Sequence, residues 1–293
     1  MNFRNSRYLP VFIIAILSLI WGSTWVVIKV GLQTLPPFLS AGWRFLLASA
    51  LLSAYALKLK LPFPKGLKTH SFLLSFSLIN FTASYSIVYW AEQYINSGLT
   101  SVLFSVMPFY VAFFSIRFLP SEQITFKKMI GITVGFLGVV LIFSDQLHFS
   151  HPLAIYAMAA VLISPAFSAL GTIVGKKARV SYHTVTLNAM PLFYTSVTLF
   201  IFHFLFERNQ TAVYNSAGIF SIVYLGIVGT AIAFVLYFWL LKTVPAVIMS
   251  LITFVTPPLA LLWGWIVLGE AVTLRLIIGM LIIFSGIIIV RRS

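Results

Sequence analysis

The chain has 293 residues, of which 60% are hydrophobic, 8% are charged and none is cysteine. A soluble domain is about half apolar and about a quarter charged, so this composition excludes a soluble protein and predicts a polytopic membrane protein. The lack of cysteine excludes a disulfide framework and thiolate metal sites. The formal net charge is +14, but the basic residues lie in short segments between apolar runs. They therefore indicate how helices are oriented in a membrane, and no nucleic-acid partner is expected.

Ten apolar stretches of the chain are long enough to cross a lipid bilayer. A helix needs about 20 apolar residues to cross a hydrocarbon core of about 30 Å. The breaks between the stretches carry prolines, as expected where the chain leaves the hydrocarbon. The predicted spans are residues 10–30, 38–57, 71–91, 98–118, 127–144, 153–174, 184–206, 216–240, 246–268 and 274–290.

The distribution of Lys and Arg predicts the orientation of these spans. If the N-terminus is cytoplasmic, 15 of the 19 Lys and Arg residues fall on the cytoplasmic side. Loops rich in Lys and Arg stay inside, and an even number of spans returns the chain to the side where it began. We therefore expect a multi-pass protein of the plasma (inner) membrane with both termini in the cytoplasm.

The second half of the chain repeats the pattern of the first. The segment SVLFSVMP at residues 101–108 returns as SLITFVTP at residues 250–257. Each segment is followed by an apolar run, a Glu and two Gly residues, namely Glu122, Gly131 and Gly138 in the first half and Glu270, Gly279 and Gly286 in the second. Unrelated apolar helices do not readily share such an ordered set. The chain is therefore predicted to consist of two copies of one unit, residues 1–144 and 145–293.

Each copy contains five predicted spans, so the second copy enters the membrane in the opposite direction. Inverted repeats are typical of secondary transporters, whose halves exchange conformations around a site near the bilayer midplane. The predicted fold is an all-α polytopic membrane protein with ten transmembrane helices, arranged as two inverted five-helix repeats around a central cavity. The predicted function is secondary transport by alternating access, without ATP.

Three features of the sequence together indicate a family. They are the ten spans in two copies, Trp21 and Trp25 followed by Lys29 in the first span, and the Pro, Glu and Gly pattern that ends each half. In this combination they resemble the EamA-type proteins of the drug/metabolite transporter superfamily. The resemblance implies a cavity lined mainly by the first, third, fourth, sixth, eighth and ninth helices. It also implies export of a small organic metabolite, such as an amino acid or a related solute.

The first span has only a loose partner in the second copy. In the sixth span Ser164 and Pro165 precede Lys176, but no tryptophan corresponds to Trp21 or Trp25. We therefore expect the two halves to line the cavity unequally.

Polar and aromatic residues that share a helix face are the candidates for the cavity wall. Trp21 and Trp25 lie in the middle of the first span, where lipid offers an indole N–H no partner. In the third span Asn80 and Ser84 form a polar stripe, which either faces the cavity or bonds to a neighbouring helix. The candidate substrate-binding residues are Trp21, Trp25, Asn80, Ser84, Tyr85, Tyr89, Ser105, Ser164, Ser168, Tyr237 and Thr253.

Charged residues in or near the spans are candidates for gates. Arg44 lies well inside a span, where it either binds substrate or a gate partner, or snorkels to the outer interface. With Lys29 and Glu92 it is predicted to form a charge cluster on the outer side. Glu122 and Glu270 follow the fourth and ninth spans at equivalent positions, where each either caps the next helix or locks a gate through an ion pair.

Prolines and glycines predict local features of the helices. Pro108, Pro165 and Pro257 are expected to kink helices inside the membrane, because proline removes an N–H and leaves a carbonyl free one turn earlier. Ser105 and Thr253 lie on the preceding turns and are expected to cover these carbonyls or to contact substrate. The glycines of the fifth and tenth spans predict close helix packing.

Two other classes of protein remain as alternatives, a membrane channel and a membrane-embedded enzyme. The sequence has no HExxH motif and no pair of mid-membrane carboxylates, so no catalytic constellation is visible and no metal or other cofactor is expected. A channel would present rings of like groups around a symmetric pore, whereas an inverted repeat suits alternation. Coupling is left open between a proton site near Glu92 and transport down the substrate gradient. The expected partners are a small-molecule substrate and the lipid bilayer, for a monomer or a homodimer.

Overall fold

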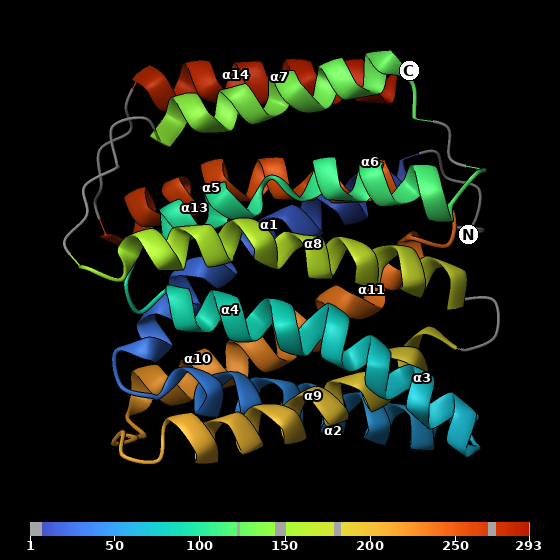
Figure 1. The fold of residues 1–293 in the computed structure, drawn as a ribbon, viewed down its shortest axis with the longest axis vertical. Coiled ribbons are helices and arrows are strands. Elements are labelled where there is room, and N and C mark those ends of the chain that lie inside the picture. The colour runs from blue at the N-terminus through green and yellow to red at the C-terminus, as the bar shows by residue number, and fades with distance from the viewer. Residues whose placement is uncertain (1–7, 122–123, 144–150, 179–182, 269–273, 293) are drawn as a thin grey trace.

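The computed structural model describes residues 8–121, 124–143, 151–178, 183–268 and 274–292, and the regular elements in these ranges are all helical. Figure 1 shows the helices side by side with roughly parallel axes, stacked along the longest dimension of the molecule. Two predicted gate residues, Glu122 and Glu270, lie outside the described residues.

The described helices form ten passes, which correspond to the ten predicted spans. Seven of the passes are long and apolar enough to cross a membrane by length and composition, and shorter apolar helices cover Ala246–Ala260 and Ile277–Val290. In chain order the passes are α1 (Leu9–Leu32), α2 (Pro37–Lys58), α3–η2–α4 (Leu67–Ser77, Leu78–Ala83, Ser84–Ala91), α5–α6 (Ser97–Phe104, Met107–Phe118), α7 (Phe126–Phe143), α8 (Ala154–Ala178), α9 (Thr184–Phe206), α10–η3–α11 (Ser216–Gly226, Ile227–Ile232, Ala233–Leu240), α12–α13 (Ala246–Ser250, Ile252–Leu268) and α14 (Leu274–Arg291).

The surface of this bundle is apolar, and its interior combines a large apolar core with many buried hydroxyl groups. Large apolar side chains such as Phe113, Phe204 and Leu281 are more than 60% exposed. In contrast, many Ser and Thr side chains, among them Thr195 and Thr230, are fully buried. An apolar surface over an interior with many hydroxyl groups suits a bundle whose solvent is lipid.

The two five-helix repeats interlock by exchanging partners. The second passes of the two repeats, α2 and α9, pack along each other at one end of the molecule, and the fifth passes, α7 and α14, do so at the other (Figure 1). The first pass of each repeat packs on the third and fourth passes of the other, α1 on α10, α11 and α13, and α8 on α4 and α6. A two-fold relation between the repeats requires this exchange. Because each repeat has five passes, equivalent helices run in opposite directions.

Glycines bring the fifth passes into close contact, as their spacing predicts. A Cβ atom added at Gly286 of α14 would lie 2.6 Å from the backbone oxygen of Gly131 in α7. One added at Gly138 would lie 2.8 Å from the backbone oxygen of Gly279. The two backbones therefore approach too closely for any larger residue at these positions.

The third pass of each repeat contains one π-helical segment. The segments η2 (Leu78–Ala83) and η3 (Ile227–Ile232) begin 149 residues apart, which is the offset of the sequence repeat. A π-helical turn shifts the register of side chains and is frequent at functional sites. The segment η2 lines the pocket described below, and η3 bonds to two residues of its wall, Trp21 and Arg44.

The fourth pass of each repeat is broken, near its middle after Phe104 in the first repeat and close to its start after Ser250 in the second. The first helix of the pass ends at Phe104, and Pro108 stands in the first turn of α6, where its missing N–H leaves no bond unmade. The helix is thus interrupted between Phe104 and Met107, directly before Pro108, and the kink assigned to this proline stays a prediction. Pro165 and Pro257 do lie inside helices, α8 and α13.

The hydroxyl groups of Ser105 and Thr253 donate hydrogen bonds to other carbonyl oxygens than the ones freed by the prolines. The carbonyl freed by Pro257 is that of Thr253, and it accepts a hydrogen bond from Thr256 Oγ1 at 3.2 Å. Thr253 itself donates to Ser250 O at 2.8 Å, and Ser105 donates to Val102 O at 2.5 Å. Each hydroxyl bonds to the carbonyl three residues before it, which is the one in reach of its short side chain.

Candidate functional site

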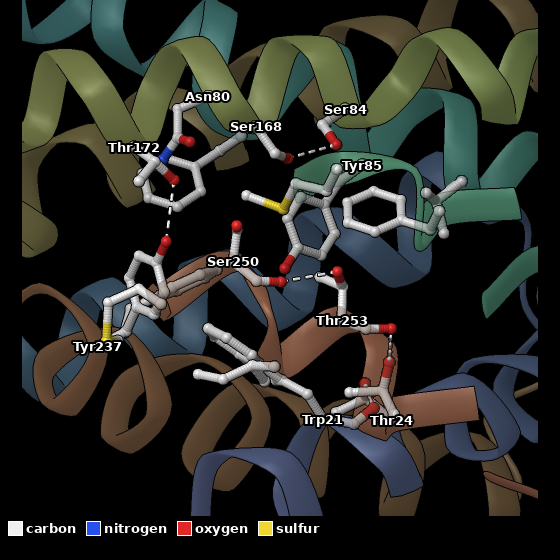
Figure 2. Close-up of a pocket in the computed structure, with 18 of the residues that line it drawn as sticks. Trp21, Thr24, Asn80, Ser84, Tyr85, Ser168, Thr172, Tyr237, Ser250 and Thr253 are labelled. Carbon is white, nitrogen blue, oxygen red and sulfur yellow. Dashed lines mark hydrogen bonds between the residues drawn. The ribbon is translucent and has the colours of Figure 1, made fainter. Parts of the chain in front are cut away.

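A pocket of about 840 Å³ of space not filled by atoms, its open mouth included, lies between the two repeats. Aromatic and hydroxyl side chains of its wall are shown in Figure 2, and the wall also contains apolar side chains and one arginine. The lining residues are Trp21, Thr24, Trp25, Ile28, Arg44, Asn80, Phe81, Ser84, Tyr85, Val88, Phe104, Met107, Ser168, Thr172, Phe234, Tyr237, Phe238, Met249, Ser250, Ile252, Thr253 and Thr256.

The wall is built by the first, third and fourth passes of both repeats. These are the first, third, fourth, sixth, eighth and ninth passes of the chain, the set that the resemblance implies. The second pass adds Arg44. These six passes form the wall because the first pass of each repeat packs on the third and fourth passes of the other repeat, which places all six at the centre of the bundle.

The two halves line the pocket unequally. Trp21 and Trp25 of α1 each precede by 147 residues a hydroxyl residue of α8, Ser168 and Thr172. Figure 2 shows Trp21 on one side of the pocket and Ser84 and Ser168 on the other. The wall on the side of Trp21 is thus rich in aromatic rings, although Thr24 also lies there, and the opposite wall carries the hydroxyl groups of Ser84 and Ser168.

The aromatic wall is formed by α1 with α11 and α5. The ring of Trp21 lies 5.3 Å from that of Tyr237 and 5.8 Å from that of Phe234, and its Nε1 donates to Gly229 O at 3.3 Å. The ring of Trp25 lies 5.5 Å from that of Phe104. The indole Nε1 of Trp25 is buried without a hydrogen-bond partner. The wall therefore offers a broad apolar surface with one unused donor.

Hydroxyl groups join the third and sixth passes on the opposite wall. Ser84 Oγ lies 3.0 Å from Ser164 Oγ, and Ser168 donates to Ser84 Oγ at 2.8 Å (Figure 2). Further along α8, Thr172 Oγ1 lies 3.0 Å from the hydroxyl of Tyr237. A short chain of hydrogen bonds thus fixes this wall.

Arg44 is the most deeply buried charge of the pocket wall, with 1% of its surface exposed. Its Nε donates to Thr230 Oγ1 at 2.7 Å, its Nη2 to Gly229 O at 3.3 Å and its Nη1 to the Tyr89 hydroxyl at 3.3 Å. The guanidinium also lies 4.9 Å from the ring centre of Tyr85. Arg44 therefore faces the bundle interior and does not snorkel to the outer interface. Each of these partners is neutral, so the positive charge stays uncancelled.

The structure separates the predicted site residues into two groups. Those that line the pocket are Trp21, Trp25, Asn80, Ser84, Tyr85, Ser168, Tyr237 and Thr253. The other three do not line it, since Tyr89 and Ser164 lie behind the wall as partners of Arg44 and Ser84, and Ser105 is buried against its own helix.

Several lining residues were not selected from the sequence, chiefly apolar ones. Helical spacing was the signal that could have found them. Phe81 and Val88 stand four residues before and three after Tyr85, and Ile28 stands three after Trp25. Positions at these spacings share one helix face.

Two lysines make equivalent bonds at opposite ends of the bundle. Lys29, in the last turn of α1, donates through Nζ to the backbone oxygens of Glu92 and Ile95, the second at 3.2 Å. Lys176, in the last turn of α8, donates to Val244 O at 2.8 Å. Ile95 and Val244 are 149 residues apart, and both lie in the link between the third and fourth passes of a repeat. Each first helix is thus tied to the link of its own repeat.

An inverted pair of five-helix repeats around one pocket is the architecture of a multi-pass membrane transporter. A model of the EamA-like transporter family matches residues 9–144 and 155–292, which is nearly the whole chain. The chain therefore belongs to the EamA-like transporter family, whose members are transporters and not enzymes.

Individual relatives agree with this assignment. The chain is 32% identical over 283 residues to an uncharacterized transporter of Archaeoglobus fulgidus, covering 96% of this chain and 98% of that protein. It is 30% identical to the uncharacterized transporter YoaV of Bacillus subtilis, with 92% of each covered, and 28% identical to the uncharacterized inner membrane transporter YedA of Escherichia coli, with 93% and 87% covered. A solved crystal structure shares the fold with a TM-score of 0.79 at 19% identity, over 98% of this chain and 99% of that one.

Proposed function

We propose that this transporter exports a small organic metabolite that carries a carboxylate and an apolar part, an amino acid or a related solute, by alternating access. The observation that carries this proposal is the uncancelled charge of Arg44 in the pocket wall. A buried cation with only neutral partners attracts an anionic group, and a guanidinium fits a carboxylate in particular.

The rest of the pocket suits the other parts of such a solute. The unused indole N–H of Trp25 supplies a second donor, and the rings of Trp21 and Tyr237 offer a surface for an apolar side chain. The hydroxyl groups of Ser84 and Ser168 on the opposite wall supply acceptors for an ammonium group.

Alternating access is supported by the symmetry of the two lysine bonds. Lys29 and Lys176 tie equivalent segments of the two repeats at opposite ends of the bundle. We take residues 1–144 and 145–293 as the two moving units. Glu122 and Glu270 remain proposed gate residues at the junctions that follow the fourth passes.

The proposed location is the plasma (inner) membrane, with both termini in the cytoplasm. The excess of Lys and Arg on one side supports the orientation, and the description of YedA as an inner membrane transporter supports the location. α1 begins and α14 ends at the same end of the bundle (Figure 1). The pocket is complete within one chain, so either a monomer or a homodimer can work.

The test is counterflow in proteoliposomes with a panel of radiolabelled amino acids, neutral solutes and cationic solutes. We expect saturable counterflow of a carboxylate solute, abolished in Arg44→Gln and partly retained in Arg44→Lys, which keeps the charge. Exchange only of cationic solutes would refute the proposal, and so would flux that does not saturate, the behaviour of a channel.

A further inference from the structure

Glu92 is a buried acid that the proposed substrate site does not use. It directly follows the last residue of α4, its side chain is fully buried, and both carboxylate oxygens lack a hydrogen-bond partner. An ionised carboxylate without donors is costly to bury, because nothing replaces its lost hydration. A neutral acid in the same place avoids most of this cost.

Two cations lie close to this acid. Lys29 of α1 bonds to the backbone oxygen of Glu92 and not to its carboxylate. Arg44 of α2 bonds to the hydroxyl of Tyr89, one helical turn before Glu92. Lys29, Arg44 and Tyr89 are electrostatically coupled to Glu92. The acid is therefore linked to the pocket wall through a single helical turn.

The neighbouring helix α8 adds no charge beside this end of α4. It presents Ala154, Ala157 and Val161 to Ala91 and Ile95. His151, just before α8, is exposed and contacts the ring of Tyr94 at 4.8 Å. Among the described residues, the charges near the Glu92 carboxyl group are thus those of Lys29 and Arg44.

We propose that Glu92 is the proton-binding site of this transporter and takes up a proton when a carboxylate binds at Arg44. The inference rests on the proposed function, because it uses the same pocket. A carboxylate on Arg44 cancels one of the two positive charges that stabilise ionised Glu92, so the acid then holds its proton more firmly. By linkage, a proton on Glu92 strengthens carboxylate binding to the same degree.

The proton on Glu92 also controls the hydrogen bonds of Lys29 at the outer end of the bundle. When Glu92 releases its proton to water, the new carboxylate attracts the Lys29 ammonium that now holds the backbone oxygens of Glu92 and Ile95. Lys29 keeps its own charge, so the change is a transfer of one hydrogen-bond donor. Lys29 then holds the side chain of Glu92 in place of the backbone oxygens of the link between α4 and α5.

The coupling has a direction. Proton and carboxylate travel together, so export down a substrate gradient carries one proton out with each molecule. An inward proton gradient acting alone favours uptake.

Infrared difference spectroscopy of the purified full-length protein in lipid nanodiscs tests the proton site without any substrate. We expect a C=O band of a protonated carboxylic acid that disappears as the pH is raised, is missing from Glu92→Gln and is retained in Glu92→Asp. Glu207→Gln is the matched control. Glu207 is also buried, but its carboxylate accepts hydrogen bonds from the backbone N–H groups of Phe38 and Leu39, so its loss should leave the band unchanged. A band that persists in Glu92→Gln would overturn the proposal.

The link to the pocket is tested by the midpoint of that titration. Arg44→Gln removes a positive charge and should raise the midpoint by about one pH unit, whereas Arg44→Lys should leave it nearly unchanged. An unchanged midpoint in Arg44→Gln would overturn the linkage. L-Phenylalanine, if bound, should raise the midpoint of the wild type as well, and binding without a shift also counts against the linkage. If L-phenylalanine does not bind, the proposed substrate class is at fault, and the two arginine variants still decide the linkage.

Discussion

Arg44 is the residue whose placement most constrains what this pocket can do. Placing an arginine at the centre of a membrane helix costs about 2.5–3.5 kcal/mol on insertion scales. Three hydrogen bonds and the ring of Tyr85 offset part of that cost, but they leave the charge in place. The hydrogen-bond partners of the guanidinium are neutral groups and do not neutralise it. The retained charge is therefore best explained by a partner that arrives from the pocket.

The indole N–H of Trp25 leads to a prediction for substrate affinity. Trp25→Phe removes this unused donor and keeps an aromatic ring beside Phe104. We expect the affinity for the carboxylate solute to fall about two- to tenfold, the value of one hydrogen bond, with little change in thermal stability. Scintillation proximity binding measures the first and a thermal shift the second.

The control for this variant is Trp43→Phe. Trp43 bonds to the hydroxyl of Tyr214 and does not line the pocket, so its loss should not affect binding. Equal affinity losses in the two variants would contradict the role given to Trp25.

Sequence reasoning could place tryptophans and polar residues in the pocket, but it could not place apolar ones. An indole or amide in the middle of a span needs an explanation, which points to Trp21 and Asn80. Phe81 and Met107 look the same whether they face lipid or a cavity. Ser105 was misplaced for a related reason, because a hydroxyl in a membrane helix can satisfy itself on its own backbone.

At the scale of elements, the ten apolar stretches predicted the number of passes, and the repeated Pro, Glu and Gly pattern predicted that the chain consists of two copies of one unit. The π-helical segments η2 and η3 carry no comparable signal in their sequences, LINFTA and IVGTAI. The segment η3 nevertheless shapes the candidate site. η3 places Gly229 O and Thr230 Oγ1 where both can bond to Arg44.

The contact between α7 and α14 leads to a prediction for stability. Gly286→Ala places a methyl group about 2.6 Å from Gly131 O, so one helix must shift. We expect a loss of about 1–3 kcal/mol, the usual cost of overpacking. The measurement is thermal unfolding in detergent, followed by the loss of monodisperse protein. Ser285→Ala, on an exposed position of the same helix, should not change stability, and a similar loss in both would argue against the close contact.

At the scale of the whole molecule, the predicted orientation has a direct test. The chain lacks cysteine, so a single introduced cysteine reports its own side of the membrane. Lys65 and Asn209 are both exposed, in the link between α2 and α3 and in the link between α9 and α10. In intact cells a membrane-impermeant thiol reagent should label Asn209→Cys and not Lys65→Cys. The reverse pattern would invert the topology.

The two lysine ties make the alternation itself testable. Thr253→Cys places one thiol in the pocket wall, where a water-soluble reagent reaches it only through an open end. Lys29→Met removes the tie at the end where α1 finishes, and Lys176→Met removes the equivalent tie at the opposite end. A hydrogen bond from a charged donor contributes about 1.5–3 kcal/mol, so each loss should change the labelling rate about tenfold or more. Lys29→Met should speed labelling from the outside, and Lys176→Met should speed it from the inside.

Lys177→Met is the matched control, because Lys177 is exposed and lies 5.4 Å from the ring centre of Phe118. It should leave both labelling rates unchanged. If Lys29→Met and Lys176→Met both opened the pocket to the same side, the ties would not act as alternate closures. The inverted repeat would then be a relation of fold only, because a working two-fold relation requires that equivalent bonds hold opposite ends.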